Sequence, residues 1–489
     1  MFKKLLVLLF FTFTTVLQAQ YTTPGTGVHW SLDDLIANAP EAVSLSEGTY
    51  TISQDITVAI NDTLAIETNV FVEIAPEVLI TIAGSFISDA EDISITAVDI
   101  EQPYEGFRFE DTSYGYFRNT TINYGGGIRV LTGNFEMDSC SMSYHVSGAA
   151  TGSAISFSTG SPIVTNSTFT FNDLPALSSG ANQEVSAIFT NNYLEANNQS
   201  NSNRPQINMG PGGNDTIRIV GNTIIGDPAL DMVGGISASS LLGNVNRVII
   251  DNNTVRNNRY GITVLGGNSS GYIRGNILED NDTQGDPMLG GSGISLNASG
   301  EPTMNIIASE NQIRRNLWGI TVIGSASINL GNTDEEDYNP GNNIFADNGN
   351  GGQTYALYNN TALTIYAMNN CWIEGEELTA ENVENVISHQ VDDNTLGEVI
   401  FTPFGCETMS VPDYTYNSPV LYPNPNTGNF TIEVPESATV EIFNISGQKV
   451  SQSQLTSGSN NLNVNLASGI YIVKTQMNKK THNSKLIIE

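Results

Sequence analysis

A polar–x–apolar triplet recurs through the middle of this 489-residue chain and constrains its fold more than any other feature. The triplets begin at Thr120, Cys140, Ser167, Asn192, Asn222, Asn253, Asn276, Asn311, Asn343 and Asn370. The shortest step between them is 20 residues (140 − 120) and the longest is 35 (311 − 276). Repeats of this length, joined by loops of unequal size, are typical of a solenoid in which each repeat forms one coil.

A second polar column follows the first by five residues. It contains His145, Asn172, Asn197, Asp227, Asn258, Asn281, Asn316 and Asn348. Equivalent positions of a parallel solenoid stack at about 4.8 Å, so asparagine amides can hydrogen-bond from coil to coil. In addition, residues 253–264 closely match residues 311–322, and each segment contains a glycine-isoleucine pair. We therefore expect internal amide ladders and a duplicated two-coil unit.

The residue types of the repeats distinguish strands from helices. The repeats are rich in Val, Ile, Thr, Asn and Gly and lack a long helical periodicity, which disfavours an α-solenoid. Strands this short gain a core only by stacking on their neighbours. The pattern resembles the right-handed parallel β-helix of pectate lyases, polygalacturonases, tailspikes and many bacterial surface proteins. The resemblance implies an all-β fold, with the β-helix at residues 21–407.

Both ends of the predicted solenoid carry short amphipathic segments. Ser31 precedes Asp34 by three residues, the spacing of a helix N-cap, and apolar residues on one face follow. At the far end Val383, Val386 and Ile387 predict a second brief helix. Such helices cap the open edges of a β-helix. Residues 408–417, which contain Pro412 and several polar residues, are expected to be a linker.

The C-terminal segment, residues 418–489, carries a separate set of motifs. They are Pro423-Asn424-Pro425, Asn444-Ile445-Ser446-Gly447-Gln448-Lys449-Val450, Gly469-Ile470-Tyr471 and Leu486-Ile487-Ile488. Its alternating apolar and polar residues, interrupted by glycines, predict a small all-β sandwich. The motifs together closely resemble the C-terminal sorting domain of cargo for the type IX secretion system of Bacteroidetes. The resemblance implies that the type IX machinery is a partner and that the protein is released or attached to the outer-membrane surface.

The N-terminus is consistent with export. Residues 1–20 contain Lys3 and Lys4, then an apolar stretch of about a dozen residues, and end in a segment with a small residue. Together these features predict a secretory signal peptide and passage through the periplasm. No later segment approaches the roughly 18 apolar residues that a transmembrane helix needs. We therefore expect no transmembrane segment in the mature protein.

The net charge of the chain limits the classes of molecule that it can bind. The chain has 51 acidic and 18 basic residues, a net charge of −33, and no lysine between Lys4 and Lys449. Such a surface repels nucleic acid, which is excluded as a partner, whereas cations and saccharides remain compatible. Polysaccharide lyases that use lysine are excluded by its absence. The Gly-His-Gly and Arg-x-Lys motifs of polygalacturonases are also missing, although an arginine base remains available.

One outward column of the repeats is charged. Arg256, Glu279 and Arg314 follow their first-column asparagines by three residues in successive coils. Two interpretations are open: a surface ion-pair ladder, or a groove in which the arginines bind carboxylates or sulfates of a polysaccharide. Tyr260 and Trp318 occupy equivalent positions of the duplicated unit. Their rings are candidates either for stacking on sugars or for ordinary packing.

Two further features concern metal and redox chemistry. Residues 332–339 form an acidic loop in which Asp334, Glu336 and Asp337 are candidate Ca²⁺ ligands, although the EF-hand spacing is absent. The alternative is a solvated loop that binds no metal. We therefore assign no cofactor, and Ca²⁺ is the one candidate. Three cysteines do not make a disulfide framework. Cys371 and Cys406 are a candidate disulfide, and the remaining cysteine is expected to be a buried thiol.

These observations leave three classes of function. The first is a secreted or surface-attached β-helix protein, not an enzyme, that binds extracellular polysaccharide or acts in adhesion. The second is a polysaccharide lyase or glycoside hydrolase of the same fold, and the third is a passive structural stalk. A long concave strip lined by arginine, carboxylate and aromatic groups would favour the first two, and a convex polar surface the third.

Overall fold

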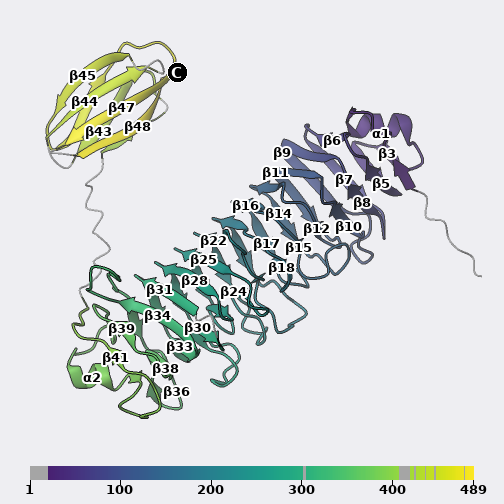
Figure 1. Ribbon diagram of the computed structural model, residues 1–489. Helices are drawn as coiled ribbons and strands as arrows, with labels where there is room; N and C mark the ends of the chain where they lie inside the picture. Colours follow the sequence, from purple (N-terminus) through teal and green to yellow (C-terminus); the bar gives the residue numbers. More distant parts are fainter. Residues whose placement is uncertain are drawn as a thin grey trace, which may run out of the picture. The chain divides into compact units, whose positions relative to one another are not determined.

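The computed structural model describes residues 20–300, 304–406, 419–422, 424, 426–434, 437–444, 448–477 and 480–488. Two compact units divide the chain, Met1–Cys406 and Glu407–Glu489 (Figure 1). The predicted linker at 408–417 and all but the last residue of the predicted signal peptide lie outside the described residues.

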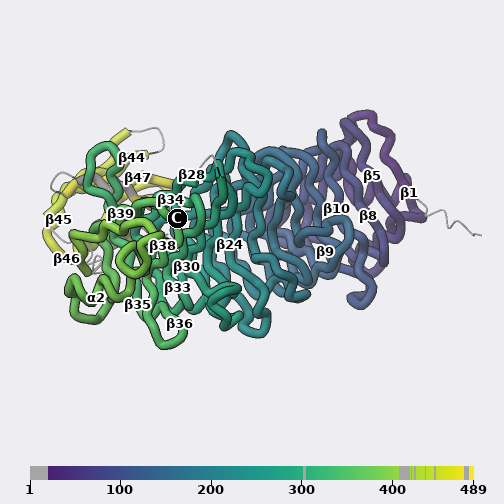
Figure 2. The backbone as a smooth tube through the Cα atoms, turned by 60° about the horizontal axis from the view of Figure 1, so that its bottom comes forward, coloured from purple at the N-terminus to yellow at the C-terminus, as the bar shows by residue number. Residues whose placement is uncertain are grey.

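The first unit is a β-helix, which confirms the predicted all-β class and parallel solenoid. Each coil contributes strands to sheets that run along the axis, and the strands pair in parallel except for the antiparallel pair Val43–Ser46 and Thr49–Ile52 (Figures 1 and 2). Sheet A has 14 strands: β1 Gln20–Thr22, β5 Asp55–Val58, β8 Leu79–Ile82, β10 Gly106–Phe109, β12 Ile128–Val130, β15 Ile155–Phe157, β18 Leu177–Ser179, β21 Ile207–Met209, β24 Ile236–Ser239, β27 Ile262–Leu265, β30 Ser292–Ala298, β33 Trp318–Gly324, β38 Leu357–Thr361 and β40 Ile387–Ser388.

Two further series of paired strands complete each coil. Sheet B contains β2 His29–Trp30, β6 Thr63–Ile66, β13 Phe135–Asp138, β16 Ile163–Thr165, β19 Ile188–Thr190, β22 Thr216–Val220, β25 Asn246–Asp251, β28 Ser269–Arg274, β31 Met304–Ser309, β34 Ala326–Gly331, β39 Ile365–Ala367 and β41 Val399–Ile400. Sheet C contains β3 Val43–Ser46, β4 Thr49–Ile52, β7 Val70–Ile74, β14 Ser141–Ser143, β17 Thr168–Thr170, β20 Tyr193–Glu195, β23 Thr223–Ile225, β26 Thr254–Arg256, β29 Ile277–Glu279, β32 Gln312–Arg314 and β35 Ile344–Ala346. The long strands β9 (Ser85–Ala97) and β11 (Tyr114–Asn123) belong to both sheets.

Alternation along each strand sends apolar side chains inward and polar ones outward. In β27, Ile262 and Val264 point into the core and are fully buried, whereas Thr263 points to the opposite face of the sheet, where it is 7% exposed. The inward residues form one continuous core along the coils. In its N-terminal part this core is aromatic, with Phe86, Phe117 and their neighbours at ring-centroid distances of 4.9 to 6.3 Å.

The first asparagine column forms the predicted ladder between sheets B and C. Side-chain amides of Asn192, Asn222, Asn253, Asn276, Asn311 and Asn343 each donate to the next asparagine, ending at Asn370, over 2.9 to 3.0 Å. These residues are buried. Each carbonyl oxygen after the first also accepts a backbone N–H of the preceding coil, so the ladder satisfies backbone groups where the chain leaves the sheets.

The second column forms a ladder at the corner between sheets C and A, with one difference from the sequence prediction. Gln206, not Asp227, fills the gap: it accepts from Asn197 at 3.0 Å and donates to Asn258 at 3.1 Å. A glutamine from a neighbouring loop reaches this position, so the column is continuous although the repeat is not. His145 heads this ladder, and burial lowers its pKa to about 4.

Short helices lie near both ends of the solenoid. Helix α1 (Leu32–Asn38) begins at the predicted N-cap Ser31, which forms a capping box with Asp34. Helix α2 (Ala380–Glu384) is capped by Thr379 and buries Val383. The expectation that Ile387 continues this helix is wrong, because Ile387 pairs with Leu357 as part of β40.

The second unit consists of two antiparallel sheets, as the alternation predicts. One has the order β42 (Val420–Tyr422), β43 (Asn429–Val434), β46 (Gly458–Asn463). The other has the order β45 (Lys449–Leu455), β44 (Ala438–Asn444), β47 (Gly469–Met477), β48 (Lys480–Ile488). Their described apolar residues form a core of their own. Of the sorting motifs, Pro423, Pro425, Ile445, Ser446 and Gly447 lie outside the described residues.

Candidate ligand-binding groove

A groove of about 810 Å³ lies on the outward face of sheet A, over the strands from β21 to β40. Its floor is the outward column Asn208, Ser237, Thr263, Ser295, Thr321 and Tyr358. The parallel register places these residues opposite one another in successive coils. Adjacent strands lie about 4.8 Å apart, so the floor presents small polar side chains at regular intervals.

Hydroxyl groups of this floor are already organised by hydrogen bonds. Thr263 Oγ1 donates to the carbonyl oxygen of Ser295 at 3.1 Å, and Thr321 Oγ1 donates to Ser295 Oγ at 3.1 Å. Ser237 Oγ and Ser239 Oγ are 2.9 Å apart. Because each hydroxyl can both donate and accept, the row keeps capacity for a ligand rich in hydroxyl groups.

Aromatic side chains form the far end of the groove. The ring of Trp318 lies 4.6 Å from Tyr355 and 5.4 Å from Tyr358, centroid to centroid. Trp318 Nε1 donates to the carbonyl oxygen of Pro287 at 2.9 Å, which fixes the indole in a half-exposed position. Rings held in this way offer an apolar surface with polar edges, the arrangement on which sugar rings stack.

Two loops contribute to the walls, residues 203–205 and residues 287–290. Arg259 ties them together, since its guanidinium donates to Asn203 Oδ1 and to the carbonyl oxygen of Leu289. Tyr260 lies beside it, and its burial raises the pKa of the phenol. Tyr260 also packs closely on Gly234, where an added Cβ would lie 2.2 Å from the ring.

The lining of the groove contains no Asp, Glu or His among the residues that the structure describes. General acid–base chemistry on a glycosidic bond normally needs two carboxylates on opposite sides of the bond. The raised pKa of Tyr260 keeps its phenol protonated near neutral pH. The described lining therefore offers a ligand hydroxyl, amide and aromatic groups together with two arginines.

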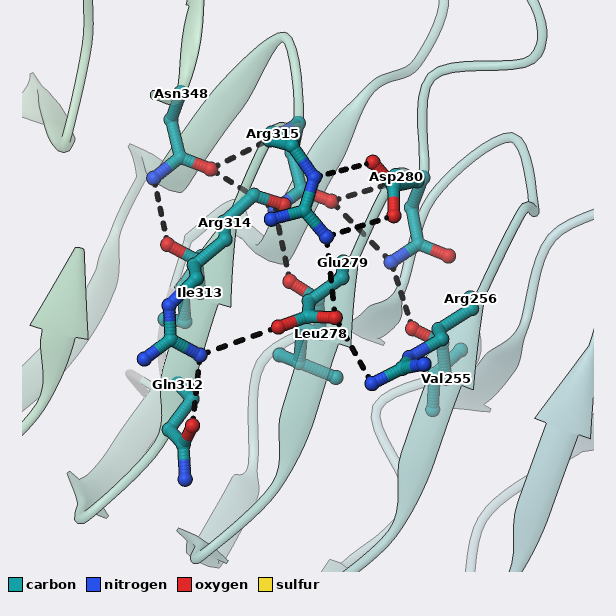
Figure 3. A network of polar contacts seen from close by, with 12 residues as sticks. Val255, Arg256, Leu278, Glu279, Asp280, Gln312, Ile313, Arg314, Arg315 and Asn348 are labelled. Carbon is teal, nitrogen blue, oxygen red and sulfur yellow. Dashed lines mark hydrogen bonds and ion pairs between the residues drawn. The ribbon is translucent and has the colours of Figure 1, made fainter. Parts of the chain in front are cut away.

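The charged column lies on a different face of the same coils. Arg256, Glu279 and Arg314 belong to β26, β29 and β32 of sheet C, in direct register (Figure 3). Glu279, whose side chain is 11% exposed, pairs with Arg256 at 3.0 Å, Arg314 at 3.2 Å and Arg315 at 3.2 Å. We call Arg256, Glu279, Asp280, Arg314, Arg315 and Glu374 the ion-pair strip.

Every guanidinium of the ion-pair strip forms an ion pair with at least one carboxylate. Arg314 also pairs with Glu374 at 2.6 Å, and Arg315 with Asp280 at 2.7 Å. The hydrogen bonds from Arg314 hold the pKa of Glu374 below its usual range, and the hydrogen bonds that Arg315 donates to Asp280 and Glu279 raise the pKa of Arg315. None of the six residues lines the groove.

The structure thus separates the residues that the sequence proposed as one site. Tyr260 and Trp318 line the groove, whereas Arg256, Glu279 and Arg314 lie around the corner on sheet C. Sequence reasoning missed the hydroxyl floor. A signal was present, because Ser237, Thr263, Ser295 and Thr321 each directly follow a glycine-isoleucine pair.

The remaining candidates lie elsewhere. Asn332 and Asn339 close the acidic loop through reciprocal backbone hydrogen bonds, and Asp334, Glu336 and Asp337 are exposed on it. In the described part of the chain, no group of three or more His, Cys, Asp or Glu side chains is arranged to hold a metal ion.

The cysteines differ in state. Cys371 and Cys406 form a disulfide near the C-terminal end of the first unit. Cys140 is a buried free thiol, and its burial raises the pKa to about 12. A thiol held protonated in this way is a weak nucleophile. Separately, none of the helices in the described ranges is long and apolar enough to cross a membrane.

Comparison with known proteins identifies the C-terminal segment. Residues 420–489 match the family described as the secretion system C-terminal sorting domain, which confirms the resemblance and indicates export to a secreted or surface location. No curated protein sequence matches the chain.

Solved structures similar to the chain include the periplasmic alginate epimerase AlgG, a double mutant of it and a single mutant. Each has a TM-score of 0.45 and 12% identity, and the alignment covers 76% of this chain and 83% of the other.

Proposed function

We propose that this protein, once exported, binds an extended extracellular saccharide along the groove of sheet A and does not cleave it. The observation that carries the proposal is the floor itself, in which stacked hydroxyl and amide side chains lead to the ring of Trp318. A regular polymer of hydroxyl-bearing rings matches a regular column of hydrogen-bonding groups, and aromatic rings hold sugar faces.

Export supports the same proposal. The sorting domain indicates delivery outside the cell, where polysaccharides are abundant ligands. A passive stalk has no need for a concave strip walled by two loops. Passage through the periplasm, and attachment to the outer membrane or release from it, are part of the proposal.

The test is retention of the purified full-length protein on a panel of immobilised acidic and neutral polysaccharides, with titration of soluble oligosaccharides for those retained. Trp318→Ala should weaken the affinity at least tenfold, because a stacking ring is lost. Tyr366→Ala is the matched control, since Tyr366 is a partly exposed aromatic residue on sheet B, outside the groove.

Equal affinity of the Trp318→Ala variant and the parent would remove the groove from the site. The same incubations should be followed for unsaturated products and new reducing ends. Appearance of either would replace the binding proposal by the lyase or hydrolase alternative.

A further inference from the structure

Arg259 is a buried cation in the wall of the groove. Its residue exposure is 8%, and the other described arginines are all more exposed. Its two hydrogen-bond acceptors, Asn203 Oδ1 and the carbonyl oxygen of Leu289, are both uncharged. Among the described residues no carboxylate forms an ion pair with Arg259, whereas Glu279 alone pairs with three arginines of the ion-pair strip.

A buried guanidinium without a counter-charge is unfavourable, and arginine cannot escape by losing its proton. The group has five N–H donors, of which two are used, and the Nε atom is buried without a partner. Room for the side chain comes from Gly290, where an added Cβ would lie 2.8 Å from Arg259 Cγ. The local structure therefore accommodates the charge without neutralising it.

A second cation lies in the same lining. Arg204 follows Asn203, the residue that Arg259 holds, and its side chain is exposed without an ion pair to any described carboxylate. The lining of the groove also differs in composition from the rest of this acidic chain. At the chain average of 51 acidic residues in 489, the 24 lining residues would hold two or three carboxylates (24 × 51/489), and they hold none among the residues described.

We propose that the saccharide is acidic, and that one of its carboxylate or sulfate groups binds the Arg259 guanidinium, with Arg204 adding positive charge at the same wall. This inference rests on the proposed saccharide function and names the class of ligand. Exclusion of carboxylates from the lining is what an anionic ligand requires on a protein whose net charge is −33. A guanidinium is suited to both anions because it donates two parallel hydrogen bonds.

The test uses the full-length protein and paired probes that differ only in charge. One pair is a polyuronate and the same polymer with its carboxyl groups reduced; the other is a sulfated glucan and its unsulfated parent. The charged member of at least one pair should bind at least tenfold more tightly, and added salt should weaken that preference. The pair that shows the preference distinguishes carboxylate from sulfate.

Variants locate the effect. Arg259→Gln and Arg204→Gln should each lower affinity for the acidic polymer at least fivefold and leave affinity for its neutral partner within twofold. Arg204 is exposed, so its variant keeps the test informative if Arg259→Gln disturbs the loops, which thermal melting would reveal. Arg256→Gln, in the ion-pair strip, is the control and should change neither affinity.

Equal binding of charged and neutral polymers, or acidic binding that survives both changes, would overturn the inference and leave saccharide binding standing. Absence of binding to every polymer, acidic or neutral, would overturn the proposed function and this inference together.

Discussion

Sheets A and C carry polar columns on the same coils, and the two faces differ in whether their arginines are paired with carboxylates. On sheet C, Arg256 and Arg314 are paired with Glu279 inside the ion-pair strip. In the groove of sheet A, Arg259 is buried, and among the described residues its hydrogen-bond acceptors are both uncharged. The ion-pair strip has more charged residues than the groove, but its arginines are less available to a ligand. Charged residues that neutralise each other stabilise a surface, whereas an unpaired buried charge indicates a site.

The corner between these faces explains how adjacent residues reach different roles. Asn258 lies between Arg256 on sheet C and Tyr260 at the groove, and it belongs to the second amide ladder. Because the ladder fixes where the chain turns, Arg256, two positions before Asn258, lies on sheet C, and Tyr260, two positions after it, lies in the groove just before β27. The ladder therefore holds both columns in register.

The largest effect is expected from breaking that shared corner. Asn281→Leu removes bonds to Asn316 and to the backbone of Val255 and Asn258, all in a fully buried position. Unpaired buried partners should lower the free energy of unfolding by about 2–4 kcal/mol. Urea unfolding of the full chain measures this. Asn305→Leu, at an exposed position of β31, is the control and should change little; equal stability of the two variants would show that the ladder is not structural.

A smaller effect is expected from making the groove resemble sheet C. Asn208→Asp adds a carboxylate to the floor with little change in shape. Affinity for the acidic polymer should fall about tenfold, equivalent to about 1.4 kcal/mol, because the new charge repels the ligand and attracts the arginines. Neutral polymer should bind as before. Asn305→Asp adds the same charge outside the groove, and a comparable loss in that variant would point to overall charge and not to the groove.

The smallest effect is expected from dismantling the ion-pair strip. Arg256→Gln combined with Arg314→Gln should leave saccharide affinity within twofold of the parent, since neither residue lines the groove. Stability should fall by about 1 kcal/mol, because Glu279 is mostly buried but keeps Arg315. Adding Glu279→Gln should restore most of that loss. Loss of saccharide binding in the double variant would move the site to sheet C.

Sequence reasoning reached the β-helix, the sorting domain and most of both ladders because these follow from fixed spacing. The first-column asparagines and the stacked order of Arg256, Glu279 and Arg314 depend only on repeat position, which the sequence contains. Duplication likewise identified Tyr260 and Trp318 as equivalent, and both line the groove.

The rest depends on loops whose lengths vary. Gln206 enters the second ladder, and Asn203 contacts Arg259, from the long connection between β20 and β21. No repeat position predicts that contact. The pairing state of an arginine is a three-dimensional property, so the sequence could not show that Arg256 is neutralised and Arg259 is not. The hydroxyl floor was accessible in principle, through the residue after each glycine-isoleucine pair.

The most direct test is amide hydrogen exchange of the full-length protein with and without a saturating oligosaccharide cut from the acidic polymer that binds best. Slower exchange in residues 199–205 and 286–290, which include the loops held by Arg259, is the predicted result, with unchanged exchange in β26, β29 and β32. Protection confined to those three strands of sheet C would contradict the account.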